Sequence, residues 1–313
     1  MGETWCMPHL HSNVLHTALI FEGGGMRASY TAAVAVALLE AGIHIDWVAG
    51  ISAGASNTAN YISRDPLRAR RSFVDFVGDR RFGGLGSLVH GRGWFDAKYI
   101  YEQTGGPDQA LPFDWATFVD NPARANVAAV RMDTGEQVWF TKADMPTMPD
   151  LMRRVRASST MPGLMPPVTI GGTDYVDGAL GPNGGIALDR AQDAGFDKFL
   201  VVLTRERDYV KTPPDRAQLA IYRAMFHRHP AVIDALVHRH LGYNATREEL
   251  FDLQADGHAY LFVPQTMPAS NVERDVGRLR ESYRAGLRQA AHELPDIAEF
   301  LGVEPAPLAE ADR

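Results

Sequence analysis

Ser52 stands at the centre of the motif GISAG (residues 50–54), with Gly50 and Gly54 at its ends. The apolar residues 45–50 predict a buried strand before it, and the small residues after it are typical of a helix start. A nucleophilic serine must project from a sharp strand-to-helix turn, where flanking glycines relieve crowding and the helix N-terminus favours negative charge. The motif therefore predicts Ser52 as a nucleophile, with an ordinary glycine-rich turn as the alternative.

A second predicted strand-to-helix turn holds three consecutive glycines, in the motif EGGGMR (residues 22–27). The apolar run at residues 17–21 predicts the strand, and residues 27–41 have the composition of a helix that stops at Gly42. Successive glycines let backbone N–H groups converge on one point, as an oxyanion hole requires. We therefore expect an oxyanion hole in this loop, assigned to Gly23, Gly24, Gly25, Met26 and Arg27.

The same loop also fits the dinucleotide-binding pattern G-x-G-x-x-A, through Gly23, Gly25 and Ala28. That function needs an acidic residue about 20 positions further on, at the carboxyl end of the second strand, to bind a ribose. Asp46 has roughly that spacing, but it stands at the start of its predicted strand, and Ser52 follows the strand's other end. This arrangement counts strongly against a nucleotide-dependent oxidoreductase.

Asp177, followed by Gly178 and Ala179, comes directly after the predicted strand at residues 173–176. On its own, an Asp-Gly pair is simply a turn. A buried carboxylate can accept the proton of a serine hydroxyl, however, if it lies within hydrogen-bond reach and is desolvated enough to be basic. Asp177 is therefore the candidate base for Ser52.

The ordered set EGGGMR, GISAG and DGA resembles the patatin-like phospholipases, whose pattern is a Gly-Gly-Gly-x-Arg loop, a G-x-S-x-G elbow and an Asp-Gly-Ala or Asp-Gly-Gly box. Two supporting segments also resemble that family: one runs from ASS at residues 157–159 through PP at 166–167, and the other is GWFD at 93–96. Together these features resemble the bacterial branch of the family. The similarity runs from about Thr17 to about Leu301.

This resemblance implies a dyad of Ser52 and Asp177 that hydrolyses lipid acyl esters without a catalytic histidine. It implies no metal and no organic cofactor. The N–H groups of the glycine loop would stabilise the tetrahedral oxyanion, and Arg27 would anchor the loop or add positive potential; otherwise Arg27 is an ordinary surface residue of the first helical turn. Ala28 departs from the family pattern, which usually has glycine there.

Strands and helices alternate along the remainder of the chain. Further strands are predicted at residues 126–130, 137–141, 168–170, 199–203 and 259–263, and further helices at 148–159, 217–241 and 272–301. We expect a three-layer α/β patatin-like fold with a mainly parallel central sheet flanked by helices. Its expected organisation is an N-terminal extension at residues 1–16, a patatin-like acyl hydrolase domain at 17–302 and a flexible tail at 303–313.

The composition suits a cytoplasmic enzyme that meets lipid from the water side. Charged residues make up 22% of the 313 residues and the net charge is -7, which argues against a nucleic-acid partner. The single cysteine, Cys6, excludes an intramolecular disulfide and fits a reducing compartment. No secretory signal or membrane-spanning stretch is predicted. We expect a lipid or simpler ester as substrate and peripheral membrane contact, with Trp94 and Phe95 either touching lipid or belonging to the core.

Two further clusters have ordinary explanations. The histidines form two H-x-H pairs on a predicted helix, where the rings face different ways and no other ligand joins them, so a metal site is disfavoured. They are His227, His229, His238 and His240. The arginines at 68, 70, 71, 80 and 81 are typical of a solvated helix face, with contact to phosphate head groups as the alternative.

Two other classes of protein compete with the dyad enzyme. An α/β-hydrolase with a Ser-Asp-His triad remains open because six histidines follow Asp177, although such enzymes carry several strands before the elbow and this chain has one. A non-catalytic lipid-binding protein of the same fold also remains open, but the joint presence of Ser52, Asp177 and the glycine loop disfavours it.

Overall fold

The strands of the computed structural model, which describes residues 10–308, form one eight-stranded sheet in the order β5-β6-β3-β2-β1-β7-β8, with β4 paired to β3 off this path. They are β1 (Val14–Phe21), β2 (Ile45–Ile51), β3 (Arg124–Arg131), β4 (Gln137–Thr141), β5 (Val168–Ile170), β6 (Thr173–Asp177), β7 (Phe199–Val202) and β8 (Ala259–Phe262). The central strands β3, β2, β1, β7 and β8 are parallel, and β4, β5 and β6 add antiparallel pairs at one side.

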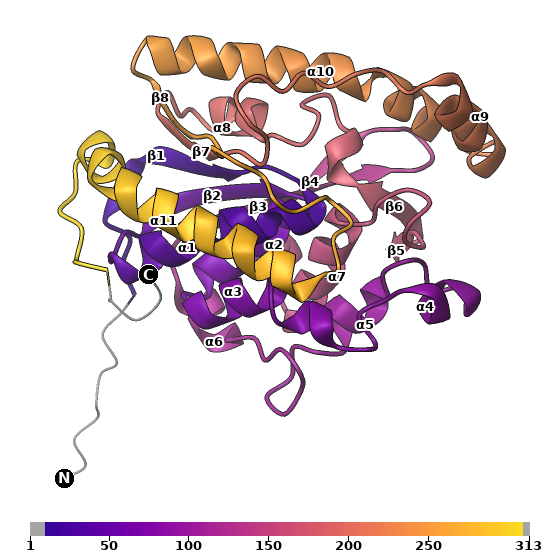
Figure 1. Ribbon diagram of the computed structural model, residues 1–313, viewed down its shortest axis with the longest axis horizontal. Helices are drawn as coiled ribbons and strands as arrows, with labels where there is room; N and C mark the ends of the chain where they lie inside the picture. The colour runs from indigo at the N-terminus through magenta and orange to yellow at the C-terminus, as the bar shows by residue number, and fades with distance from the viewer. Residues whose placement is uncertain (1–9, 309–313) are drawn as a thin grey trace.

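Helices cover both faces of this sheet, so the fold is the expected three-layer α/β arrangement (Figure 1). They are α1 (Ala28–Glu40), α2 (Ala53–Ile62), α3 (Pro66–Phe73), α4 (Leu85–Val89), α5 (Ala97–Glu102), α6 (Trp115–Asp120), α7 (Met148–Ser158), α8 (Leu188–Asp193), α9 (Arg216–Met225), α10 (Pro230–Ala255) and α11 (Val276–Leu301). Helices α1 and α11 pack on one face, while α8 and α10 pack on the other.

Strand β1 shows why a continuous apolar run was the right signal for the centre of the sheet. Its residues Leu19 and Phe21 belong to the core on the α1 side, whereas Ala18 and Ile20 belong to the core on the α10 side. Successive side chains of a strand point to opposite faces, so a strand covered on both sides needs apolar residues at every position.

Both ends of the expected domain differ from the sequence-based boundaries. Strand β1 begins at Val14, so the last residues of the expected extension at 1–16 are already part of the sheet, and residues 1–9 lie outside the described part. The described part of the expected flexible tail is attached to the body: the Ala306 N–H donates to the Ala41 carbonyl over 2.9 Å, and Leu308 packs against the core. The apolar contact of Leu308 is the physical reason for this attachment.

The helical segment expected at residues 217–241 is two helices, because Pro230 begins a new one. Proline fits the first turn of a helix, where its missing N–H has no partner to lose. Helix α10 then continues to Ala255, past Gly242, whose backbone lies against the Pro182 carbonyl. A Cβ at residue 242 would lie 1.9 Å from that oxygen, so the glycine here permits a close approach rather than ending the helix.

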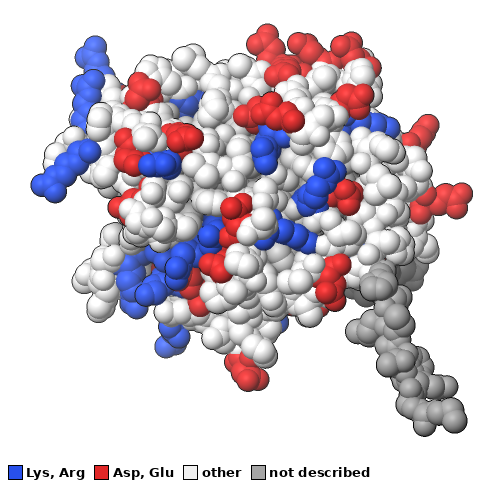
Figure 2. Space-filling model, turned by 180° about the vertical axis from the view of Figure 1, so that it is seen from behind, with Lys and Arg blue, Asp and Glu red and all other residues white. Residues whose placement is uncertain are grey.

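The described part of the chain shows mixed charges on one face and has no helix suited to crossing a membrane. On the face shown in Figure 2, basic and acidic side chains are interspersed, with a group of acidic ones along the upper edge. None of the helices within residues 10–308 is both long enough and apolar enough to cross a bilayer.

Candidate active site

Ser52 occupies a strained turn between β2 and α2. Its φ of 58° and ψ of -125° lie outside the regions that a non-glycine residue ordinarily adopts. Two serines at the end of α7 hold the turn: the Ser52 N–H donates to Ser158 Oγ over 2.9 Å, and Ser159 Oγ donates to the Ser52 carbonyl over 3.0 Å. Such strain persists only where the surroundings fix it, and it commonly marks a functional site.

Gly50 and Gly54 flank the elbow for reasons of space. A Cβ at residue 50 would lie 2.1 Å from the Gly54 carbonyl oxygen, and a Cβ at residue 54 would lie 2.1 Å from the Phe21 carbonyl oxygen. Neither glycine has a positive φ, so the requirement is close backbone approach rather than backbone conformation. These contacts seat the elbow directly against the carboxyl end of β1.

Asp177 lies within hydrogen-bond distance of Ser52, although the two residues are 125 positions apart. Ser52 Oγ donates to Asp177 Oδ2 over 2.7 Å, and both side chains are 5% exposed. The sheet register explains the meeting: Ile51 on β2 pairs with Ala128 on β3, and the next residue of β3, Ala129, pairs with Asp177 on β6. The parallel and antiparallel neighbours of β3 thus bring the two motifs together.

Burial raises the pKa of the Asp177 carboxyl. The Ala179 N–H, which donates to Oδ1 over 2.9 Å, the positive charge of Arg239 and the bond from Ser52 all act in the opposite direction, but burial dominates. A carboxylate with a raised pKa is a stronger base than a solvated aspartate. Gly178 has no room for a side chain, because its Cβ would lie 2.3 Å from the Ala128 carbonyl oxygen.

The glycine loop presents two N–H groups beside Ser52, fewer than the sequence suggested. The loop lies against the elbow, since a Cβ on Gly23 would be 3.1 Å from Ser52 Cβ. However, the Gly23 N–H donates to the Gly185 carbonyl over 3.0 Å, and the Met26 N–H donates to the Asn271 carbonyl over 3.0 Å.

The Arg27 N–H is engaged as well, because it donates to the Gly24 carbonyl over 3.3 Å. Within the described part of the chain, the N–H groups of Gly24 and Gly25 have no hydrogen-bond acceptor. The loop can therefore offer these two donors to an oxyanion, whereas the inclusion of Met26 as a donor does not fit this structure.

Arg27 is not an ordinary surface residue. Its guanidinium is largely buried, and burial together with the positive charge of Arg205 lowers its pKa to about 10. Glu22, the first residue of the motif, supports the same region: its carboxylate accepts from the Thr204 N–H over 2.5 Å and from the Tyr243 hydroxyl over 2.8 Å. Glu22 thereby ties the glycine loop to the segment after β7 and to α10, a role that sequence reasoning missed.

An apolar cleft opens at Ser52 between α2, α3, α5 and α7. It contains about 740 Å³ of empty space, the open mouth included. Besides Ser52 and Gly25, its walls are mostly apolar, with Phe73, Phe76, Phe82 and Met161 among them. The Tyr101 hydroxyl bonds to Ser56 and Ser159 at this wall, and burial raises its pKa.

Two of the sequence-based alternatives for surface residues are resolved by this cleft. Phe95 is 2% exposed and lines the cleft, so it belongs to the core, and Trp94 is half-buried against the same cluster. Arg68 also lines the cleft, where it donates to Asn60 and to the Pro112 carbonyl, and burial lowers its pKa to about 10. Arg68 is therefore not part of a solvated helix face, whereas Arg80 and Arg81 are exposed.

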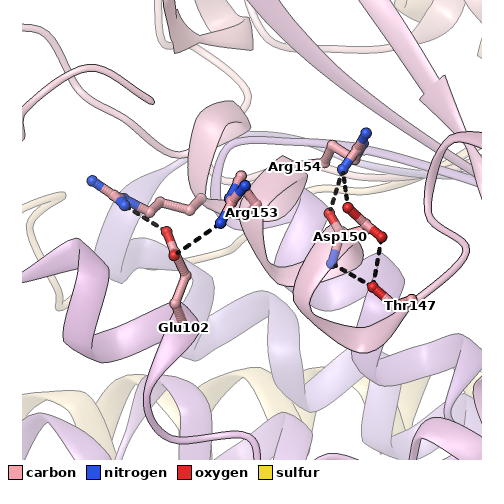
Figure 3. A network of polar contacts seen from close by, with 6 residues as sticks. Glu102, Thr147, Asp150, Arg153 and Arg154 are labelled. Atoms are coloured by element: carbon pink, nitrogen blue, oxygen red, sulfur yellow. Dashed lines mark hydrogen bonds and ion pairs between the residues drawn. The ribbon is translucent and has the colours of Figure 1, made fainter. Parts of the chain in front are cut away.

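A network of ion pairs fixes the helix that supports the elbow (Figure 3). Glu102, at the end of α5, pairs with Arg156 and, over 3.9 Å, with Arg153 of α7. One turn earlier on α7, Asp150 pairs with Arg154 over 3.1 Å. These contacts place the last residue of α7, whose hydroxyl accepts the elbow N–H. The ASS segment at residues 157–159 was the sequence signal for this support of the elbow. It did not indicate that Glu102 and Asp150 would form ion pairs with arginines of α7.

Between residues 10 and 308, no histidine hydrogen-bonds to Ser52 or Asp177 or lines the cleft. His238 instead lies 3.0 Å from Asp234, one turn away on α10. Over the same range, no group of three or more His, Cys, Asp or Glu side chains has the arrangement of a metal site. Asp46 lies at the start of β2 and pairs with Arg124 over 3.1 Å.

The fold and the sequence together define a class of protein. Residues 19–188, more than half of the chain, match the family model described as patatin-like phospholipase, and the chain belongs to that family. Membership points to lipid acyl hydrolase activity. Residues 229–302 match a second model, a domain of unknown function (DUF6363), which covers all of α10, β8 and α11.

The relatives are distant. The chain is 26% identical over 297 residues to the uncharacterized protein YjjU of Escherichia coli (strain K12), covering 93% of this chain and 80% of that protein. It is 30% identical over 193 residues to lysophospholipase nte1 of Aspergillus terreus (strain NIH 2624 / FGSC A1156), covering 59% of this chain but 12% of that protein. The crystal structure of VipD from Legionella pneumophila shares 13% identity with a TM-score of 0.46, over 90% of this chain and 67% of that one.

Proposed function

We propose that this protein is a serine acyl hydrolase that cleaves lipid acyl esters through a dyad of Ser52 and Asp177. The observation that carries the proposal is the 2.7 Å contact between Ser52 Oγ and Asp177 Oδ2, at a strained elbow that opens into an apolar cleft. The cleft supports an acyl chain as the bound group, because its walls are mostly apolar around few polar groups.

The mechanism follows from the positions of these groups. Ser52 Oγ attacks the ester carbonyl while Asp177 takes the hydroxyl proton. The oxyanion that develops is stabilised by the N–H groups of Gly24 and Gly25, which are otherwise without acceptors in the described chain. Collapse of this intermediate expels the alcohol, which receives the proton from Asp177. Water, activated by the same carboxylate, then releases the fatty acid from the acyl-enzyme.

The nucleophile is tested by covalent labelling. We expect a fluorophosphonate to modify the wild-type protein on Ser52 and to leave Ser52→Ala unlabelled, with mass spectrometry to locate the adduct. Ser56→Ala, a change in the same cleft on α2, is the matched control and should still be labelled. An adduct on any other serine would contradict the assignment.

A panel of phospholipid, lysophospholipid, monoacylglycerol and short-chain esters tests the reaction itself. The proposal would be overturned if the protein cleaved none of them.

The pH dependence tests the base. Because Asp177 must be ionised to accept the proton and its pKa is raised, kcat/KM should be fully developed at high pH and should fall as the pH drops through that raised pKa. The groups that face the carboxylate are Arg239, Ser52, the Ala179 N–H and the Tyr101 ring. Arg239→Gln removes the one cation and should move the acid limb to higher pH.

Kinetics on a soluble ester, with circular dichroism at each pH, provide the measurement. An acid limb at the ordinary aspartate pKa would argue against a buried base. A limb that moves only when a histidine is replaced would favour the triad enzyme.

A further inference from the structure

Four basic side chains at and around the glycine loop act on one another electrostatically, and together they are called the basic cluster. They are Arg27, Arg205, Lys211 and Arg239. Arg27 comes after β1 and Arg205 comes after β7. Strand β1 pairs in parallel with both β7 and β2, the strand before Ser52, so all three residues lie at the carboxyl edge of the sheet. Ligands of open α/β sheets bind at this edge.

The basic cluster forms no ion pair with any carboxylate among residues 10–308, although the charge of Glu22 acts on Arg27 and Lys211. No carboxylate forms an ion pair with any of its members. The Nε atoms of Arg27, Arg205 and Arg239 are shielded from solvent and have no hydrogen-bond acceptor. Glu22 is the nearby carboxylate, but its two oxygens already accept from Thr204 and Tyr243.

Aromatic rings hold two of these cations in place. The Arg205 guanidinium lies 4.1 Å from the centre of the Tyr209 ring, and Lys211 Nζ lies 4.6 Å from the centre of the Tyr243 ring. Such contacts position a cation without neutralising it. Burial lowers the pKa of Lys211 to about 7, and the positive charges of Arg239, Arg27 and Arg205 act in the same direction.

The basic cluster adjoins the reaction centre on the side away from the apolar cleft. Arg27 directly follows the glycine loop, and Arg239 on α10 acts electrostatically on Asp177. The cleft instead runs between α2, α3, α5 and α7. A substrate whose carbonyl lies at Ser52 and whose acyl chain fills the cleft would therefore direct its alcohol portion toward the basic cluster.

We propose that the basic cluster binds a phosphomonoester head group of the lipid whose acyl ester lies at Ser52. Phosphate oxygens accept several charge-assisted hydrogen bonds from guanidinium and ammonium groups at once. A phosphomonoester carries two negative charges and therefore neutralises more of the cluster's positive charge than a phosphodiester does. The quaternary ammonium of a choline head group would be repelled by the same cations. The head-group preference rests on the proposed acyl hydrolase function; the anion site itself does not.

The kinetic test compares three substrates with the same acyl chain: lysophosphatidate, lysophosphatidylcholine and monoacylglycerol. We expect the wild-type kcat/KM for lysophosphatidate to exceed both others by about tenfold or more. The double variant Arg205→Gln/Lys211→Gln leaves Arg239, which acts on Asp177, and Arg27, which follows the glycine loop, in place. It should lower the preference for lysophosphatidate about tenfold. Arg207→Gln is the matched control: it removes an exposed cation of the same segment, which packs on Phe251, and should keep the preference.

A binding measurement separates the anion site from catalysis. Calorimetry with the Ser52→Ala protein should detect glycerol 3-phosphate, and the affinity should fall at least tenfold when Arg205→Gln/Lys211→Gln is added. Absence of binding, or binding that the double variant leaves unchanged, would overturn the site. Inorganic phosphate that binds more tightly than glycerol 3-phosphate, with no lipid preference, would overturn the head-group assignment. If glycerol 3-phosphate binds as expected but no lipid ester is cleaved, the acyl hydrolase proposal fails and the anion site stands.

Discussion

Asp177→Asn is expected to lower kcat by about 10⁴-fold while the protein stays folded. The asparagine amide can keep its oxygen at the Oδ1 position, where it accepts the Ala179 N–H, and can place its NH2 group at the Oδ2 position, where it donates to Ser52 Oγ. The amide cannot take the proton, however, and in the described chain no histidine stands ready to replace it. Steady-state and single-turnover hydrolysis of a lysophospholipid measure the loss, which should appear in the chemical step rather than in KM.

The same substitution makes a prediction about stability that distinguishes catalysis from damage. Burial raises the pKa of Asp177, so the folded state prefers its neutral form, and the ionised form costs the folded state free energy at neutral pH. Thermal unfolding of Asp177→Asn should therefore occur at an equal or higher temperature than in the wild type. Asp174→Asn, an exposed change on the same strand, is the matched control and should leave kcat unaltered. A loss of less than tenfold in Asp177→Asn would contradict the dyad.

The local parts of this architecture could be predicted because each is specified by neighbouring residues. A run such as TALIF closed by glycines predicts a buried strand, since a strand covered on both faces is apolar at every position. The strand-to-helix turns at GGG and GISAG are predicted in the same way, because in each an apolar run gives way to glycines and then to a helical pattern. The expected strands and the mainly parallel sheet agree with the structure for this reason.

The remainder depends on contacts between distant segments, which no local pattern records. Met26 was assigned as an oxyanion donor, yet its N–H meets the Asn271 carbonyl, contributed by the loop before α11. Arg68 belongs to a segment rich in arginine, but it faces inward with Ser72, one turn further along α3, and both approach Asn60. The basic cluster likewise combines residues from the segment after β7, from α10 and from the glycine loop, and each member alone resembles an ordinary surface charge.

The two free N–H groups of the glycine loop lead to the second large effect, which we expect from Gly25→Ala. Gly25 has a φ of +56°, and a Cβ there would lie 2.3 Å from the Asn271 carbonyl oxygen, so the loop must shift away from Ser52. Displacing the oxyanion donors should raise the barrier by ~3 kcal/mol, which corresponds to a fall in kcat of about 10²-fold with little change in KM.

Gly42→Ala is the matched control for Gly25→Ala, because it separates backbone strain from the loss of the donors. Gly42 has a φ of +70°, similar to that of Gly25, but a Cβ there would meet nothing within 4 Å. Its replacement should cost about 1 kcal/mol of stability and leave kcat unchanged. Steady-state kinetics and thermal unfolding of the two variants provide the comparison. Equal kcat values would mean that the loop contributes nothing to the oxyanion, because only Gly25 adjoins Ser52.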